Sequence, residues 1–485
     1  MAVDLRAALG ALLRRWGRIT VWHSIAVCLT LLYTGWLAVR TTRNHFGLGT
    51  SAYDFGLYDQ GVWLLSQGKA PFVTLMGRNL FGDHTSFILL PLVPLYWVVG
   101  STGLLFVVQA IALGLGALPI WKITRHLLGS LPMSCIAVVA YLLHPALTYT
   151  GLENFHPDAA LAPLIAWALY AGITYRWVQY TFAVLLILAV KEDTALFVVA
   201  LGAWVALRRD RQIGLLTIFG AVWFAVLMLF AVMRGIVGVP YRNEWRLPFG
   251  GFGGLIRTAL TRPDKLIRHL VDGERPLYLL QILAPVGFVA LLRPEIALLG
   301  TLPLLTNLVS TFWYQSQIEY HYAVQFVPIV VIGAMFAISR VAEHLRSWMA
   351  GLVLAGALIC AVAWTPLPLM RVQAPTWTPR HPSVSAAHEA ISRVPHDSVV
   401  AAYHTLTAHM ARRERIYVFP VPFRRVLYGP DVFAKGDRLP FADEVQFVIL
   451  PRELDGEAEL DWQRESSRFE VVYGNDWWTV YERLR

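Results

Sequence analysis

The stretch SAYDFGLYDQGVWLLSQGKAPF, residues 51–72, follows the first strongly apolar segment of the chain. It holds two aspartates, Asp54 and Asp59, together with aromatic residues and glycines. Acidic side chains near membrane depth are costly and normally mark a function. What these two acids do depends on which side of a membrane the stretch occupies, and the rest of the chain decides that side.

The composition indicates a polytopic membrane protein. The 485 residues are 56% hydrophobic and only 15% charged, whereas soluble globular proteins carry about 25% charged residues. Several apolar runs reach the roughly 18 residues that a spanning helix needs. The net charge of +9 comes from short basic clusters between these runs, which is typical of cytoplasmic loops and gives no support to a nucleic-acid partner. The three cysteines lie inside apolar runs and indicate neither disulfides nor a metal site: Cys28, Cys135 and Cys360.

The basic residues predict the topology, because positively charged loops stay on the cytoplasmic side. Residues 1–18 are basic and amphipathic and are expected in the cytoplasm. The proline-bearing run at 86–100 is expected to lie in the membrane interface, although a crossing there stays open. The expected spans are 19–39, 103–121, 131–150, 158–175, 177–190, 194–207, 213–234, 277–292, 294–309, 322–339 and 347–366. About eleven helices then cross the membrane, and the C-terminus lies outside.

Three regions follow from this topology. They are the basic cytoplasmic segment 1–18, a multispanning region 19–367 with outer loops at 40–102 and 235–276, and an extracytoplasmic region 368–485. In the last region the chain is richer in proline and charge, and no run could span a membrane. Strand-like runs at 398–403, 415–419, 445–450, 469–474 and 477–483, with helices near 383–394 and 405–413, predict a small α/β domain.

The polar motifs all fall on the outer side of this topology. They are YDFGLYDQ (53–60), GDHTS (82–86), ENFHPD (153–158), KED (191–193), YRNEWR (241–246) and YQSQIEYHY (314–322). Since buried acids and histidines in membrane proteins normally serve a function, six such clusters on one side predict a single outward-facing site.

The opening stretch predicts a short amphipathic helix over residues 55–67. Its apolar residues recur at helical spacing, Gly68 is a natural C-terminal stop, and the helix is expected to lie on the outer membrane surface. Asp54 could cap this helix or act in a reaction, and the two roles can coexist. Asp59 points to a different side of the helix from Asp54, so the two acids do not form a dyad.

The next two motifs offer ligands for a phosphate or a metal. Asp83 and His84 could bind a phosphate or an acceptor, or cap the following helix. Glu153 and His156 have Glu-x-x-His spacing, which places both on one helical face where they could bind a metal. Asp158 could join them or simply favour a helix N-terminus.

KED is expected at the tip of a short helical hairpin. Lys191, Glu192 and Asp193 could form internal ion pairs, or Lys191 could reach a substrate phosphate. The remaining motifs add Arg242, Arg246, Glu319 and His321 to the same side. The segment GGFGG (250–254) is expected to be a flexible outer loop, and neither a Walker loop, a dinucleotide fingerprint, HExxH nor GxSxG occurs.

The order of these motifs resembles a known family. YDFGLYDQGVWLLSQGKAPF…DHTSFILLPLVPLYW, ENFHPDAALAPL, VKEDTAL and YHYAVQFVPI resemble the bacterial membrane family called domain of unknown function 2079. The resemblance covers about residues 30–340, and the C-terminal tail matches only loosely. That family in turn resembles the GT-C glycosyltransferases, which implies an α-helical polytopic membrane fold with a soluble C-terminal domain.

The resemblance implies an inverting glycosyltransferase in the plasma membrane that takes a sugar from a polyprenyl-phosphate donor on the outer face. Asp54 then matches the loop acid that acts as base or orients the acceptor. Residues 54–55 are DF, where those enzymes more often have two adjacent acids, DE or DD, so Asp59 stays an alternative. His84, Lys191, Arg242, Arg246 and His321 would bind the donor phosphate or substrate. Supporting polar groups would be Tyr58, Asp83, Glu153, His156, Asp158, Glu192, Asp193 and Glu319. The acceptor could be an envelope glycan, glycolipid or protein, and a divalent cation could take part.

Two other functions stay open from the sequence. A transporter or lipid flippase would need acids at the bilayer midplane and a repeat between the two halves, whereas the polar clusters lie at span ends and no repeat is found. A non-catalytic membrane protein would use its outer α/β domain to recruit a partner.

Overall fold

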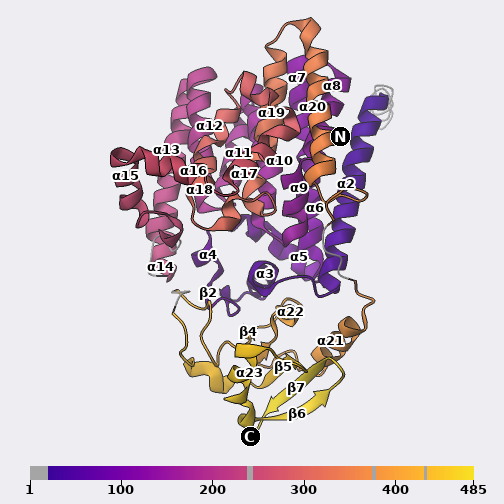
Figure 1. Cartoon of the computed structure of the whole chain (residues 1–485), viewed down its shortest axis with the longest axis vertical. Helices are drawn as coiled ribbons and strands as arrows, with labels where there is room; N and C mark the ends of the chain where they lie inside the picture. Colours follow the sequence, from indigo (N-terminus) through magenta and orange to yellow (C-terminus); the bar gives the residue numbers. More distant parts are fainter. Residues whose placement is uncertain (1–19, 238–243, 374–377, 431–433) are drawn as a thin grey trace, which may run out of the picture.

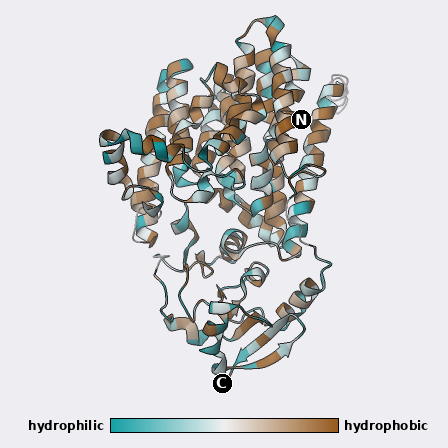
Figure 2. Ribbon diagram, in the orientation of Figure 1, coloured by the Kyte–Doolittle hydropathy of each residue, from teal (hydrophilic) through white to brown (hydrophobic). Residues whose placement is uncertain are grey.

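A bundle of helices with a small α/β domain at one end makes up the molecule (Figure 1). The structure is a computed structural model, and it describes residues 20–237, 244–373, 378–430 and 434–485. The predicted basic segment 1–18 and Arg242 lie outside the described residues. Colouring by hydropathy shows mainly hydrophobic helices in the bundle (Figure 2), as expected for helices that face lipid and each other.

The bundle follows the predicted segments closely. Its main helices are α2 (Val21–Phe46), α6 (Leu104–Leu115), α7 (Ala117–Leu128), α8 (Leu131–Leu142), α9 (Pro145–Glu153), α10 (Leu161–Ile173), α11 (Trp177–Leu188), α12 (Ala195–Arg208), α13 (Arg211–Leu227), α18 (Thr301–Val309), α19 (Phe326–Ser339) and α20 (Glu343–Trp364). Among the described residues, five helices are long and apolar enough to span by themselves, or six if α8 and α9 form one bent span. Several others are apolar but shorter, so the count of about eleven spans stays a prediction.

Two segments predicted as straight spans are broken. The segment 131–150 bends by 43° between α8 and α9, because Pro145 has no N–H to donate into the preceding turn. The segment 277–292 ends as α17 (Arg275–Leu283) and continues in 3₁₀ turns, because Gly287 and Phe288 adopt left-handed backbone angles, with φ of 59° and 58°. The prediction of one regular helix there was wrong.

Close helix packing in the bundle depends on small residues. In the α12–α13 hairpin, a Cβ built on Gly214 would lie 2.1 Å from the backbone nitrogen of Ala206. Gly220, two turns further along α13, has open space around it. Small residues let helix backbones approach closely in membranes. The close approach of α12 therefore requires glycine at position 214, whereas position 220 has room for a side chain.

The C-terminal domain contains a mixed five-stranded sheet. Its strand order is β4 (Ile416–Val418), β3 (Val400–Ala402), β5 (Phe447–Pro451), β7 (Trp478–Arg483) and β6 (Phe469–Gly474), with β4, β3 and β5 parallel and β7 and β6 antiparallel. All five predicted strands are confirmed, as is the helix near 383–394, which is α21 (Pro382–Ser392). The helix predicted at 405–413 is a single turn, α22 (His404–Thr407), and α23 (Gly456–Gln463) was not predicted.

The helix from the opening stretch lies between the bundle and this domain (Figure 1). It consists of a π-helical turn, η1 (Ala52–Gly56), and α3 (Leu57–Ser66), and Gly68 follows its end with φ of 69° as predicted. Apolar residues of this loop share one core with residues of the domain. The helix is thus largely buried, and its location on the outer membrane surface stays a prediction.

Two further loop segments have more structure than expected. Residues 250–254 were predicted to be a flexible loop, but Gly250 caps α15 (Gly251–Thr261), so that prediction was wrong. The apolar run after residue 86 forms η2 (Phe87–Leu92) and α5 (Val93–Val98), whose combined length is too short to count among the spans.

Candidate active site

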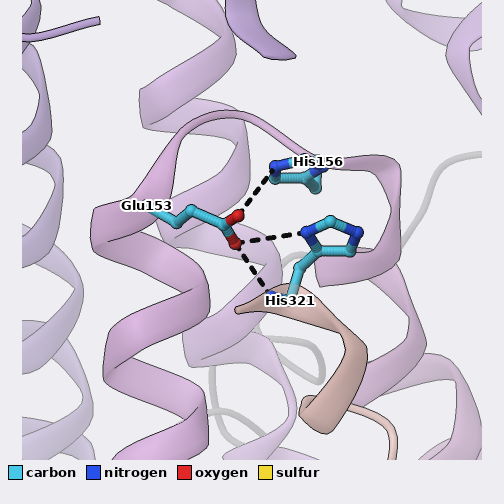
Figure 3. Close-up of side chains that lie close together, drawn as sticks. All are labelled: Glu153, His156 and His321. Carbon is cyan, nitrogen blue, oxygen red and sulfur yellow. Dashed lines mark hydrogen bonds and ion pairs between the residues drawn. The ribbon is translucent and has the colours of Figure 1, made fainter. Parts of the chain in front are cut away.

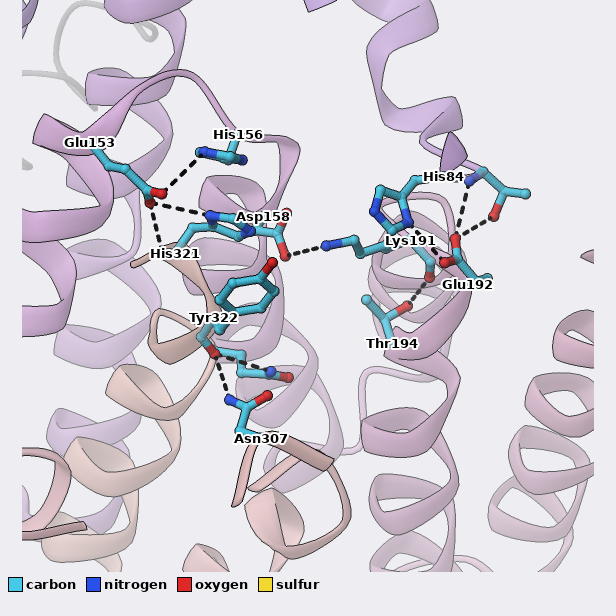
Figure 4. Close-up of polar contacts among 12 residues, drawn as sticks. His84, Glu153, His156, Asp158, Lys191, Glu192, Thr194, Asn307, His321 and Tyr322 are labelled. Carbon is cyan, nitrogen blue, oxygen red and sulfur yellow. Dashed lines mark hydrogen bonds and ion pairs between the residues drawn. The ribbon is translucent and has the colours of Figure 1, made fainter. Parts of the chain in front are cut away.

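Segments that carry five of the six polar motifs lie at the end of the bundle that faces the C-terminal domain (Figure 1), and Figure 4 shows side chains of four of these motifs close together. They come from η1, the turn after α4 (Leu80–Asp83), the end of α9, the α11–α12 turn and the segment before α19. The structure therefore brings these five motifs together, and the side of the membrane that they face stays a prediction. The sixth motif is only partly described, because it includes residues 241–243.

Glu153, His156 and His321 form the centre of the cluster (Figure 3). Glu153 Oε2 accepts a hydrogen bond from the His321 backbone N–H at 2.8 Å and lies 3.2 Å from His321 Nδ1. Glu153 Oε1 lies 3.6 Å from His156 Nε2. The two imidazoles stack with their centroids 3.6 Å apart. Burial, and then His321, lower the pKa of His156, which keeps its imidazole neutral.

A buried glutamine in α6 holds the loop that carries these groups. Gln109 Nε2 donates to the Asn154 carbonyl at 2.7 Å, and its Oε1 accepts from the His156 N–H at 2.8 Å. The loop would otherwise leave its backbone groups unpaired in an apolar bundle. Sequence reasoning missed Gln109, although an isolated amide within an apolar run was a signal that could have found it.

Lys191 lies beside this centre and pairs with Asp158 (Figure 4). Its Nζ is 3.4 Å from Asp158 Oδ1 and 5.6 Å from the centre of the Tyr322 ring. Burial opposes the charged form, but Asp158 and then Asp193 hold the pKa of Lys191 well above its usual value. The predicted internal ion pair is thus present, and the buried ammonium also faces an aromatic ring that the sequence reasoning had not selected.

Glu192 links the α11–α12 turn to the loop formed by residues 40–102. It accepts from the Thr85 N–H at 3.1 Å and lies 2.9 Å from His84 Nδ1. The Ile88 N–H donates to the Ala189 carbonyl at 2.8 Å. The start of the apolar segment η2–α5 is therefore fixed next to the α11–α12 turn that carries Lys191.

Asp54 has a different environment from the other acids. Ser51, not Asp54, caps the helix by accepting from the Tyr53 N–H, so of the two roles left open for Asp54 the capping role is wrong. Within the described part of the chain, its carboxylate has no hydrogen bond or ion pair. Burial raises its pKa, and of its charged neighbours His156 lowers that pKa while Glu153 raises it.

The other first-loop acids are paired with arginines. Asp59 is fully buried, binds Arg412 of the C-terminal domain at 3.1 Å and accepts from the Tyr96 hydroxyl at 2.7 Å. Asp83 binds Arg78 at 2.9 Å. The Asp59 pair joins the loop to the C-terminal domain and the Asp83 pair lies within the loop, whereas Asp54 interacts electrostatically with His156 and Glu153.

The remaining predicted residues lie at varying distances from the centre. Tyr58 is buried with its ring 6.3 Å from that of His156. Arg246 lies over the Phe312 ring at 4.3 Å. Asp193 and Glu319 are exposed, although Asp193 still acts electrostatically on Lys191.

Comparison with known proteins agrees with this architecture. Residues 44–482 match the profile of a family described as predicted membrane protein, DUF2079. ArnT from Cupriavidus metallidurans, a GT-C glycosyltransferase, has a similar structure in a crystal form bound to undecaprenyl phosphate, with a TM-score of 0.54 and 11% identity over 96% of this chain and 98% of ArnT. Its apo structure gives a TM-score of 0.56 and 13% identity over 99% and 98%. No curated protein matches the sequence significantly.

Proposed function

The chain belongs to the DUF2079 family of membrane proteins and has a GT-C fold, and on this basis we propose that it is a glycosyltransferase. It transfers a sugar from a polyprenyl-phosphate donor to an acceptor on the outer face of the plasma membrane. Asp54 is the base or acceptor-orienting group, and Lys191 binds the donor phosphate. The neighbour bound to undecaprenyl phosphate supports a lipid donor of this class.

The observation that carries this proposal is the contrast between Asp54 and the other acids of the cluster. Asp59, Asp83 and Asp158 each have a basic partner within 3.4 Å. Asp54 has none among the described residues, and burial raises its pKa. A carboxylate kept unpaired at some cost is typical of a general base, which must be available to a substrate proton.

The chemistry requires little beyond these groups. Polyprenyl phosphate is a good leaving group, so no general acid is needed. As the acceptor hydroxyl attacks the anomeric carbon, its proton passes to Asp54 and the bond to the phosphate oxygen breaks. A buried cation next to that oxygen stabilises the charge that develops on it, and Lys191 is such a cation.

The lipid tail has a route beside this site. The segment η2–α5 starts next to the Lys191 turn and exposes large apolar side chains: Leu90, Leu95, Trp97 and Val98. We propose that the polyprenyl chain lies along this exposed surface while its phosphate reaches Lys191. This assignment extends the interfacial role that the sequence predicts for the segment.

A transfer assay tests the proposal. Purified, reconstituted protein is offered a panel of radiolabelled polyprenyl-phosphate sugars with an envelope extract as acceptor. We expect product from one donor, and its loss in Asp54→Asn. Asp210→Asn is the matched control, because Asp210 caps α13 at the opposite end of α12 from the Lys191 turn and asparagine caps equally well.

Two outcomes would contradict the proposal. Full activity in Asp54→Asn would reject Asp54 as the base. Absence of product with every donor would reject the transferase, provided that the protein is folded and the same extract accepts sugar in native membranes.

A further inference from the structure

The three side chains at the centre of the cluster are arranged as metal ligands. We propose that Glu153, His156 and His321 bind one divalent transition-metal ion, and that Zn²⁺ is the ion that suits them best. The proposal does not depend on glycosyl transfer, because it concerns only what these three groups can bind.

The distances between the donor atoms fit a single ion. All three ligand atoms lie within 4.8 Å of one another. His321 Nδ1 is 3.2 Å and His156 Nε2 is 3.6 Å from the nearer oxygens of Glu153. Ligands bound tetrahedrally to Zn²⁺ at about 2.1 Å each lie about 3.4 Å apart. The two measured distances lie on either side of this value.

His156 supplies a second, independent observation. It is buried, only 5% exposed, and its Nε2 has no hydrogen-bond partner in the described part of the chain. The distance of 3.6 Å to Glu153 is too long for a hydrogen bond. Buried polar nitrogens are nearly always paired, so an unpaired one that faces a carboxylate and another imidazole indicates a missing ligand.

The three groups are held in place by their surroundings. The Glu153 carboxylate is oriented by the His321 N–H, and the backbone of His156 is fixed by Gln109. Such supporting contacts orient metal ligands and raise affinity. The Nε2 atom of His156, which has no hydrogen-bond partner among the described residues, can donate a lone pair to the ion.

The donor set selects the class of ion. Two imidazoles and one carboxylate suit Zn²⁺ and its neighbours in the first transition series, whereas Mg²⁺ prefers oxygen ligands. Three protein ligands also leave a fourth position open, as in catalytic zinc sites. Asp54 is close enough to interact electrostatically with His156 and Glu153, so a cation here would also act on that carboxylate.

Metal binding by the full-length protein tests the proposal directly. After chelator treatment and removal of the chelator, the protein is titrated with Zn²⁺ and with Mg²⁺ by calorimetry, and bound zinc is counted by mass spectrometry. We expect one Zn²⁺ per chain and no binding of Mg²⁺. Glu153→Gln and His156→Asn should each weaken Zn²⁺ binding by more than about 100-fold, since even changes to supporting residues cost roughly 10- to 100-fold.

His409→Asn is the matched control. His409 is a half-buried histidine that likewise stacks on a second imidazole, that of His45, with centroids 4.3 Å apart. Its replacement should leave the zinc affinity and stoichiometry unchanged. If His409→Asn abolished binding while Glu153→Gln did not, the assignment would be wrong.

X-ray absorption on the zinc-loaded wild-type protein needs no variant. We expect nitrogen and oxygen ligands at about 2.0–2.1 Å with scattering from two imidazoles. A spectrum without imidazole, or a wild-type protein that binds no zinc, would overturn the proposal. Both measurements omit the sugar donor, so a failed transfer assay does not affect their outcome.

Discussion

Lys191 is a buried ammonium whose partner, Asp158, is also buried. Removing one member of such a pair leaves an uncompensated charge and is strongly destabilising, by about 3–5 kcal/mol. We therefore expect Lys191→Met to lower the melting temperature and to abolish transfer. The double variant Lys191→Met, Asp158→Asn should recover most of the stability but none of the activity, which thermal denaturation and the transfer assay measure separately.

The double variant decides whether Lys191 binds phosphate or only neutralises Asp158. Loss of a cation that stabilises the leaving group should lower kcat by about 100- to 1,000-fold. If the double variant regained both stability and transfer, the role of Lys191 would be limited to its ion pair.

Replacement of Asp54 should have the opposite effect on stability from replacement of Lys191. Its pKa is raised by burial, so the folded protein binds this proton more tightly than the unfolded chain. Stability from this group is present at low pH and is lost as the pH rises through the raised pKa. At neutral pH, Asp54→Asn should therefore melt at a temperature equal to or above that of the wild type, although it is inactive.

The same pKa shift predicts the pH profile. Asp54 acts as a base only when it is ionised, so kcat/KM should fall as the pH decreases through its raised pKa. The acidic limb should lie above the ordinary range for an aspartate and should disappear from any residual activity of Asp54→Asn. An acidic limb at the ordinary position would count against Asp54.

The sequence could predict that the polar motifs meet, but not how individual acids are used. Motifs at the ends of neighbouring spans must lie on one side of the membrane, whatever the packing. The choice between Asp54 and Asp59 was not accessible, because the partner of Asp59 is Arg412, 353 positions away. Tyr322 was likewise overlooked because its role depends on the position of Lys191.

At the scale of the helix, α13 provides a matched pair of glycines. Gly214→Val would push a side chain into the backbone of α12 at Ala206, whereas Gly220→Val would extend into open space. We expect the first change to destabilise the protein by about 3 kcal/mol or more and the second to have an effect within about 0.5 kcal/mol. Melting temperatures in detergent compare the two, and equal values would contradict the close α12–α13 packing.

Apolar periodicity located most of the bundle helices but not their interruptions. The bend before α9 could have been expected from Pro145. The break after α17 could not, because Gly287 fits there only by its close approach to α20, where a Cβ would lie 2.9 Å from Leu352 Cγ. Such a break depends on tertiary packing, which a hydropathy pattern does not contain.

At the scale of the whole molecule, Arg412 joins the two parts of the fold. It binds Asp59 and donates to the carbonyls of Gly100 and Ser101, both at 2.8 Å. Arg412→Met would leave Asp59 buried without its partner, so we expect a loss of about 3–5 kcal/mol. Increased proteolysis between the bundle and the C-terminal domain should accompany the lower melting temperature.

Arg415→Met is the control for this prediction. Arg415 pairs with Glu444 at the surface of the same domain, and both side chains are about half exposed. Exposed pairs contribute about 0–1 kcal/mol, so this variant should behave like the wild type. Similar losses in the two variants would show that the interdomain position of Arg412 has no special role.

The burial of α3 beneath the C-terminal domain has a consequence for biogenesis. Residues 48–106 and 384–480 contribute to one apolar core, yet the ribosome makes the first segment long before the second. At roughly 5–20 residues per second, the interval is on the order of tens of seconds. During that time the apolar side chains of the early loop lack the residues of the C-terminal domain that bury them. A chain that stalls before residue 384 never acquires those residues. We therefore expect chains truncated before residue 384 to expose these apolar side chains and to be degraded faster than the full chain.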